Sequence, residues 1–72
     1  MKITFDKVAD AVYIETSEKE FFNNRKIDDE TIIDLDKEGK IIGIELLNVS
    51  KRMSEDFLKD IKLQNLNIDY SQ

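Results

Sequence analysis

The stretch TIIDLDKEGKIIGIELLNVS, residues 31–50, decides the fold of this chain. Before Gly39, Ile33 and Leu35 alternate with acidic residues, and after it aliphatic side chains return at every second position. A period of two is typical of a half-buried strand, and glycine supplies the positive φ that a tight turn needs. The stretch therefore predicts a β-hairpin.

The same alternation predicts how the two strands pair. With the turn at Gly39, Leu35 lies opposite Ile42, and the next apolar pair is Ile33 with Ile44. A slip of one residue would bury the intervening aspartates with the apolar set, so the sequence specifies one alignment.

The opposite face of this hairpin is not wholly polar, because Ile32 and Ile41 point to it. Such a face can take the helix or a second subunit. Glu45 lies on the same face, next to Gly43 in the strand, and is the best candidate there for a polar contact with a partner.

The hairpin sequence also matches most of the pattern of a calcium-binding loop, in which clustered carboxylates around a glycine turn bind a hard cation. The flanks are strand-like, however, and Glu45 lies across from Ile32, well back from the turn at Gly39. The hairpin is therefore the favoured interpretation, and no metal or cofactor is predicted. Four residues remain as weak metal-ligand candidates: Asp34, Asp36, Glu38 and Glu45.

Residues 2–6 and 11–15 have the same two-residue period. A four-residue loop between them sets Phe5 opposite Val12 and Ile3 opposite Ile14, which places the large apolar groups on one face. A shorter strand is indicated around Arg25. Residues 1–50 thus predict an antiparallel β-meander of about four strands.

The pattern changes after residue 50. Ser54 is a good N-cap, and Phe57, Leu58 and Ile61 form one apolar stripe of a short helix. Residues 66–71 alternate again, so a terminal strand is an alternative end to the chain. The chain is expected to be a single small α+β domain over 1–72, with the meander in 1–50 and the helix and tail in 51–72.

Composition limits the chemistry of this small acidic chain. Its 72 residues contain no Cys and no His, which excludes disulfides, thiolate metal sites and His-based catalysis. The net charge of -5, from 16 acidic and 11 basic residues, disfavours nucleic acid as a partner. A domain this short has a thin core, so oligomerisation is the expected source of further stability.

Neither a signal peptide nor a membrane span is expected, since no apolar run approaches the required length. The expected location is the cytoplasm. No phosphate-binding glycine loop is present, and no serine has an evident activating base. The chain is therefore predicted not to be an enzyme, with no catalytic residues.

Several blocks of residues carry a family resemblance: Phe5-Asp6 with ADAVYI (9–14), IIDLD (32–36) with Gly39, and IGIELL (42–47) ending near Ser50. With these, over most of residues 3–50, the chain resembles the YuzE-like family of small prokaryotic proteins, a domain of unknown function (2283). The resemblance implies a compact β-rich domain with no assigned activity. The acidic residues 28–30 replace a turn that often contains glycine in the family, and the residues after 50 fall outside the resemblance.

The expected function is a non-catalytic protein-interaction module, either a homodimer or half of a heteromeric pair. Some relatives look like partners of small toxin-like proteins, which implies an antitoxin-like alternative. A second alternative is a small-molecule or cation-binding protein that uses the acidic hairpin 34–45. The candidate interaction residues are Ile32, Ile41, Glu45, Leu66, Ile68 and Tyr70.

Overall fold

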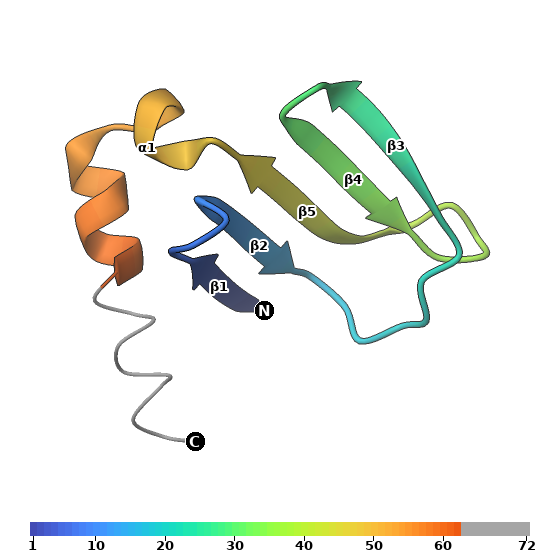
Figure 1. Cartoon of the computed structure of the whole chain (residues 1–72). Helices are drawn as coiled ribbons and strands as arrows, with labels where there is room; N and C mark the ends of the chain where they lie inside the picture. Colours follow the sequence, from blue (N-terminus) through green and yellow to red (C-terminus); the bar gives the residue numbers. More distant parts are fainter. Residues whose placement is uncertain (63–72) are drawn as a thin grey trace.

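The computed structural model describes residues 1–62, which form an antiparallel sheet with two helices beside it (Figure 1). The elements in chain order are β1 (Lys2–Asp6), β2 (Ala11–Glu15), β3 (Asn23–Asp28), β4 (Thr31–Leu35), β5 (Ile41–Leu47) and α1 (Val49–Arg52), followed by a second helix over residues 55–62. The predicted α+β class is confirmed. The predicted terminal strand, with Leu66, Ile68 and Tyr70, lies outside the described residues.

The strand order is β1-β2-β5-β4-β3, so the sheet departs from a consecutive meander. β5 lies between two hairpins, and residues 16–22 carry the chain from β2 to the outer strand β3 (Figure 1). The character of the strands suits their places in this order. β5 is seven residues long and mostly aliphatic, as a central strand should be, whereas every residue of β3 is exposed, as suits an edge strand.

The predicted register is largely confirmed. Phe5 pairs with Val12 in the first hairpin, and Ile33 pairs with Ile44 between β4 and β5. Asp34 lies opposite Gly43, as expected from the same alternation. The large apolar side chains therefore share one face of the sheet.

The predicted pairing of Leu35 with Ile42 is wrong, because Leu35 pairs with Ile41 across a register shift. Asp36 closes the turn, since its Oδ1 accepts the backbone N–H groups of Glu38 and Lys40, each at 2.9 Å. This wider turn leaves Ile42 as the extra residue of a β-bulge. Ile42 is 4% exposed and Ile41 is 48% exposed, so the bulge decides which isoleucine is buried.

The helices cover one face of β1, β2 and β5. Val12, Val49 and Ile61 are buried at the centre of this core. The second helix begins as predicted, because the Ser54 hydroxyl oxygen accepts the N–H of Phe57 at 3.2 Å. α1 was not expected from the sequence. The partly buried side chains packed against the centre are Ile3, Phe5, Ile14, Leu46, Met53, Phe57 and Leu58.

Residues 21–35, which are the β3–β4 hairpin and the two phenylalanines before it and which we call the wing, lie at the β3 edge of the sheet, away from the helices (Figure 1). The wing contributes no residue to the hydrophobic core cluster described above. Its aliphatic residues on β4, Ile32, Ile33 and Leu35, are only half-buried. Within residues 1–62, no helix is long and apolar enough to cross a membrane.

Candidate functional site

The face of the sheet opposite the helices, which we call the open face, is covered by no described element. The strand register arranges its side chains in rows that cross the five strands. One row is Thr4, Tyr13, Glu45, Ile32 and Lys26. The adjacent row is Lys2, Glu15, Gly43, Asp34 and Asn24.

Tyr13 leans from the first row across Gly43 toward Asp34. Its hydroxyl donates a hydrogen bond of 3.1 Å to Oδ2 of Asp34. A Cβ placed on Gly43 would lie 1.9 Å from the Tyr13 hydroxyl oxygen, so only glycine leaves room for the ring. Burial raises the pKa of Tyr13 to about 12, aided by the hydrogen bond to Asp34, so the phenol remains a donor at neutral pH.

Asp34 and Glu45 are neighbours on this face although they belong to different strands. Asp34 is 8% exposed, and its Oδ1 is buried with no hydrogen-bond partner among the described residues. Burial raises the pKa of Glu45, and the neighbouring Asp34 carboxylate raises it further. Tyr13, Asp34 and Glu45 thus form a compact titratable group, the open-face cluster.

An open depression of about 330 Å³ lies beside this cluster. Tyr13 and Glu45 form part of its wall, and Leu47 is an apolar part of its lining. The remaining lining residues are Thr4, Asp6, Ala11 and Val12. The depression has both apolar and acidic groups but no described basic residue.

The four metal-ligand candidates do not form one site. Asp36 is 7% exposed and uses its carboxylate to close the turn, whereas Asp34 contacts Tyr13 on the open face. Glu38 is exposed in the turn, and Glu45 is half-buried in β5. Within residues 1–62, no group of three or more His, Cys, Asp or Glu residues is placed to hold a metal ion.

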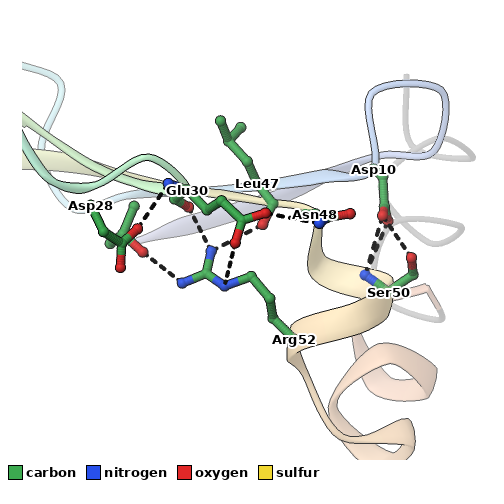
Figure 2. Close-up of polar contacts among 8 residues, drawn as sticks. Asp10, Asp28, Glu30, Leu47, Asn48, Ser50 and Arg52 are labelled. Atoms are coloured by element: carbon green, nitrogen blue, oxygen red, sulfur yellow. Dashed lines mark hydrogen bonds and ion pairs between the residues drawn. The ribbon is translucent and has the colours of Figure 1, made fainter.

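A second polar cluster joins the β1–β2 turn to α1 (Figure 2). Asp10, at a φ of 55°, accepts hydrogen bonds from the hydroxyl of Ser50 at 2.6 Å and from its backbone N–H at 3.2 Å. The carbonyl of Asp10 also accepts the N–H of Val49 at 3.1 Å. No sequence pattern indicated that Asp10 would bond to the start of a helix forty residues away.

Arg52 ties the other end of α1 to the β3–β4 turn (Figure 2). Its guanidinium donates to the carbonyls of Glu30 and Leu47 and to the hydroxyl of Thr31. The Glu30 carboxylate lies 3.9 Å from Nε of Arg52 and accepts a hydrogen bond from the Asn48 side chain at 2.8 Å. This network fixes the junction between the sheet and the first helix.

The acidic turn at residues 28–30 forms without the glycine that the resemblance implies. Oδ1 of Asp28 accepts the backbone N–H of Glu30 at 2.8 Å, which replaces a glycine turn with an Asx-type turn. The same N–H holds the pKa of Asp28 below its ordinary value. Asp28 is therefore a structural residue of the wing.

Exposed apolar side chains concentrate on the wing. Phe21, Phe22 and Ile27 are 54%, 61% and 58% exposed. Phe22 extends the β3 edge, since its N–H donates to the carbonyl of Leu35 at 2.9 Å. Ile41, a predicted interaction residue, is exposed in the strand position opposite Leu35.

The other predicted interaction residues lie elsewhere. Ile32 and Glu45 are half-buried on the open face, and Leu66, Ile68 and Tyr70 lie outside the described residues. The sequence did not single out Phe21 and Phe22, because this pair has no periodic signal. The available signal was two adjacent aromatic residues directly before the most polar strand.

Of the comparisons with known proteins, only that with family models found a match. No curated protein and no solved structure matches the chain. One family model, described as a protein of unknown function (DUF2283), matches residues 2–50. The match spans the five strands and ends within α1 at Ser50, the residue that Asp10 caps. The chain therefore belongs to this family, the protein of unknown function DUF2283.

Proposed function

We propose that the protein is a non-catalytic interaction module that self-associates through its wing. The observation that carries this proposal is the position of the core. The described helices pack over β1, β2 and β5, while the wing contributes no residue to that core and carries exposed aromatic side chains. A second copy is the occupant that we propose for this surface.

The apolar side chains of the wing supply a driving force for association. Phe21, Phe22 and Ile27 are each more than half exposed. Fully burying one such side chain contributes about 2 kcal/mol. A chain of 72 residues buries only a small hydrophobic core. Covering these side chains in a dimer would therefore stabilise the folded state as well as the association.

Charge on the wing favours a second copy over an unrelated chain. The middle of β3 carries Arg25 and Lys26, and its end carries Asp28 and Asp29. In a two-fold dimer the same patch meets itself in reverse, so the basic part of one copy can face the acidic part of the other. A surface with both signs in this order is complementary to itself.

The open-face cluster supports a non-catalytic role. The pKa of Tyr13 is raised to about 12, which makes the phenol a poor general acid near neutral pH, and its hydroxyl is already bonded to Asp34. The described serine hydroxyls with hydrogen-bond partners have structural roles: that of Ser50 donates to Asp10, that of Ser54 accepts at the start of the second helix, and that of Ser17 accepts in a turn. We therefore propose no substrate.

Sedimentation velocity of the full chain over a concentration series tests the proposal. The wild type should approach twice the monomer mass at high micromolar concentration, and the double variant Phe21→Ser/Phe22→Ser should remain monomeric and folded. Val8→Ser is the matched control, because Val8 is 99% exposed in the β1–β2 turn, outside the wing. Wild-type chain that stays monomeric throughout, or a control that disrupts association as strongly, would contradict the proposal.

The antitoxin-like alternative rests on the family resemblance alone. It requires a tight complex with a different chain that persists when the wing aromatic residues are replaced. Co-expression with a small protein encoded beside this one, followed by sedimentation, separates the two cases.

A further inference from the structure

One buried carboxylate oxygen of the open-face cluster lacks a hydrogen-bond donor among the described residues. Asp34 is 8% exposed, yet its Oδ1 has no donor among residues 1–62, while Oδ2 accepts from Tyr13 at 3.1 Å. A buried acceptor without a partner costs about 1–3 kcal/mol, and more when it is charged. Native proteins rarely leave such a group unpaired, so the missing donor needs an explanation.

Glu45 is placed to supply that donor. It lies one row from Asp34 on the same face of adjacent strands, a diagonal distance that long side chains span. A protonated Glu45 carries one O–H donor, and a charged Glu45 carries none. Proton loss from Glu45 would therefore leave two negative groups in contact and the buried Oδ1 unpaired.

The surroundings do not offer a cation instead. Among the described residues, no lysine or arginine forms an ion pair with Asp34 or Glu45. On the neighbouring strand β2, Tyr13 and Glu15 face the pair, and Glu15 adds a further negative charge. The charged groups on this face of the two outer strands are Lys2 and Asp6 on β1 and Lys26 on β3.

We propose that Glu45 keeps its proton in the folded protein and donates it in a hydrogen bond to Oδ1 of Asp34, which makes the pair a pH-sensitive contact between β5 and β4. While the proton is present, Glu45 lies against Asp34. When the proton passes to solvent, repulsion turns the Glu45 carboxylate outward, toward the depression that it lines, and adds one negative charge to the open face. Tyr13 remains bonded to Asp34 in both states, because its phenol keeps its proton.

The proton on Glu45 contributes to the free energy of unfolding, and the pH dependence of this contribution follows from the raised pKa of Glu45. The folded state retains a proton on Glu45 at pH values where the unfolded chain has lost it, because burial and Asp34 raise the pKa of Glu45. The contribution is fully present below the ordinary glutamate pKa and is lost as the pH rises through the raised pKa.

Carbon-13 NMR titration of the side-chain carboxyl groups tests the contact directly. In the wild type, Glu45 should titrate above the ordinary glutamate value. In Asp34→Asn its titration should fall back toward that value, whereas the control Glu15→Gln, which removes a charge from the same face, should leave it nearly unmoved. An ordinary titration of Glu45 in the wild type, or one that Asp34→Asn does not move, would overturn the proposal.

A second measurement covers the case in which Asp34→Asn does not fold. Glu45→Gln keeps a donor at this position at every pH and so mimics the protonated contact. The melting temperature of Glu45→Gln relative to the wild type should rise as the pH rises through the raised pKa of Glu45. A difference in melting temperature that is independent of pH would contradict a proton held on Glu45.

Discussion

The ring of Tyr13 occupies the space that a side chain at Gly43 would need: a Cβ on Gly43 would lie 1.9 Å from the hydroxyl oxygen and 2.4 Å from the carbon that bears it. Gly43 is thus required for space in the middle of the central strand, where glycine is otherwise unfavourable. The close approach lets Tyr13 of β2 reach across β5 to Asp34 of β4. One hydrogen bond therefore spans three strands.

Gly43→Ala should destabilise the protein by about 1–3 kcal/mol, since the new methyl group displaces the ring and breaks the bond to Asp34. The measurement is urea denaturation followed by circular dichroism. Combining the change with Tyr13→Ala makes a double-mutant cycle. In the Tyr13→Ala background, Gly43→Ala should change the free energy of unfolding only slightly. Additive costs in that cycle would show that the glycine serves another purpose.

Asp10→Gly should destabilise the fold by about 1 kcal/mol, because the hydrogen bonds to Ser50 are lost while glycine tolerates the positive φ. Asp10→Ala should cost about 1 kcal/mol more, since alanine disfavours the left-handed region. Thermal unfolding of both variants checks the order. A stabilising effect of Asp10→Gly would mean that backbone strain outweighs the cap.

Arg52→Lys should destabilise by about 1 kcal/mol, a modest value because the network is partly exposed to solvent. An ammonium cannot span the carbonyls of Glu30 and Leu47 as the planar guanidinium does. Lys51→Ala is the control, because it removes a neighbouring positive charge of α1. If Arg52→Lys were as stable as the wild type, the positive charge alone would explain the stabilisation, and the hydrogen-bond geometry of the guanidinium would not matter.

Asp36→Ala should cost about 2 kcal/mol, because it leaves two backbone N–H groups of the β4–β5 turn without their acceptor. Asp36→Asn retains an acceptor oxygen and should cost less. Thermal unfolding of the wild type and Asp36→Ala, with and without calcium, also tests the cation-binding alternative. Millimolar calcium should leave the wild-type melting temperature unchanged, whereas a rise that Asp36→Ala abolishes would support binding at the hairpin.

The parts of the fold that were predictable are those between neighbours in sequence. Phe5 with Val12 and Ile33 with Ile44 follow from the two-residue period on either side of a short turn. The bulge beside Leu35 did not follow, because it depends on how the Asp36 side chain bonds the turn.

The candidate sites were less predictable because they join distant segments. Tyr13 meets Asp34 only because β5 inserts between β2 and β4, and no local pattern fixes that order. The contacts of Asp10 with Ser50 and of Glu30 with Arg52 have the same origin. Parity placed Asp34 and Glu45 on one face, but it did not show that Asp34 would be buried there with one oxygen left without a donor among the described residues.

The most direct test of the self-association account is a dilution series of nitrogen-15 NMR spectra of the full chain. Self-association through the wing should move the backbone signals of Phe21, Phe22 and β3 with concentration, while those of β1 and the second helix stay in place. Concentration-dependent changes confined to β1 or the open face, or spectra identical at every concentration up to the solubility limit, would contradict it.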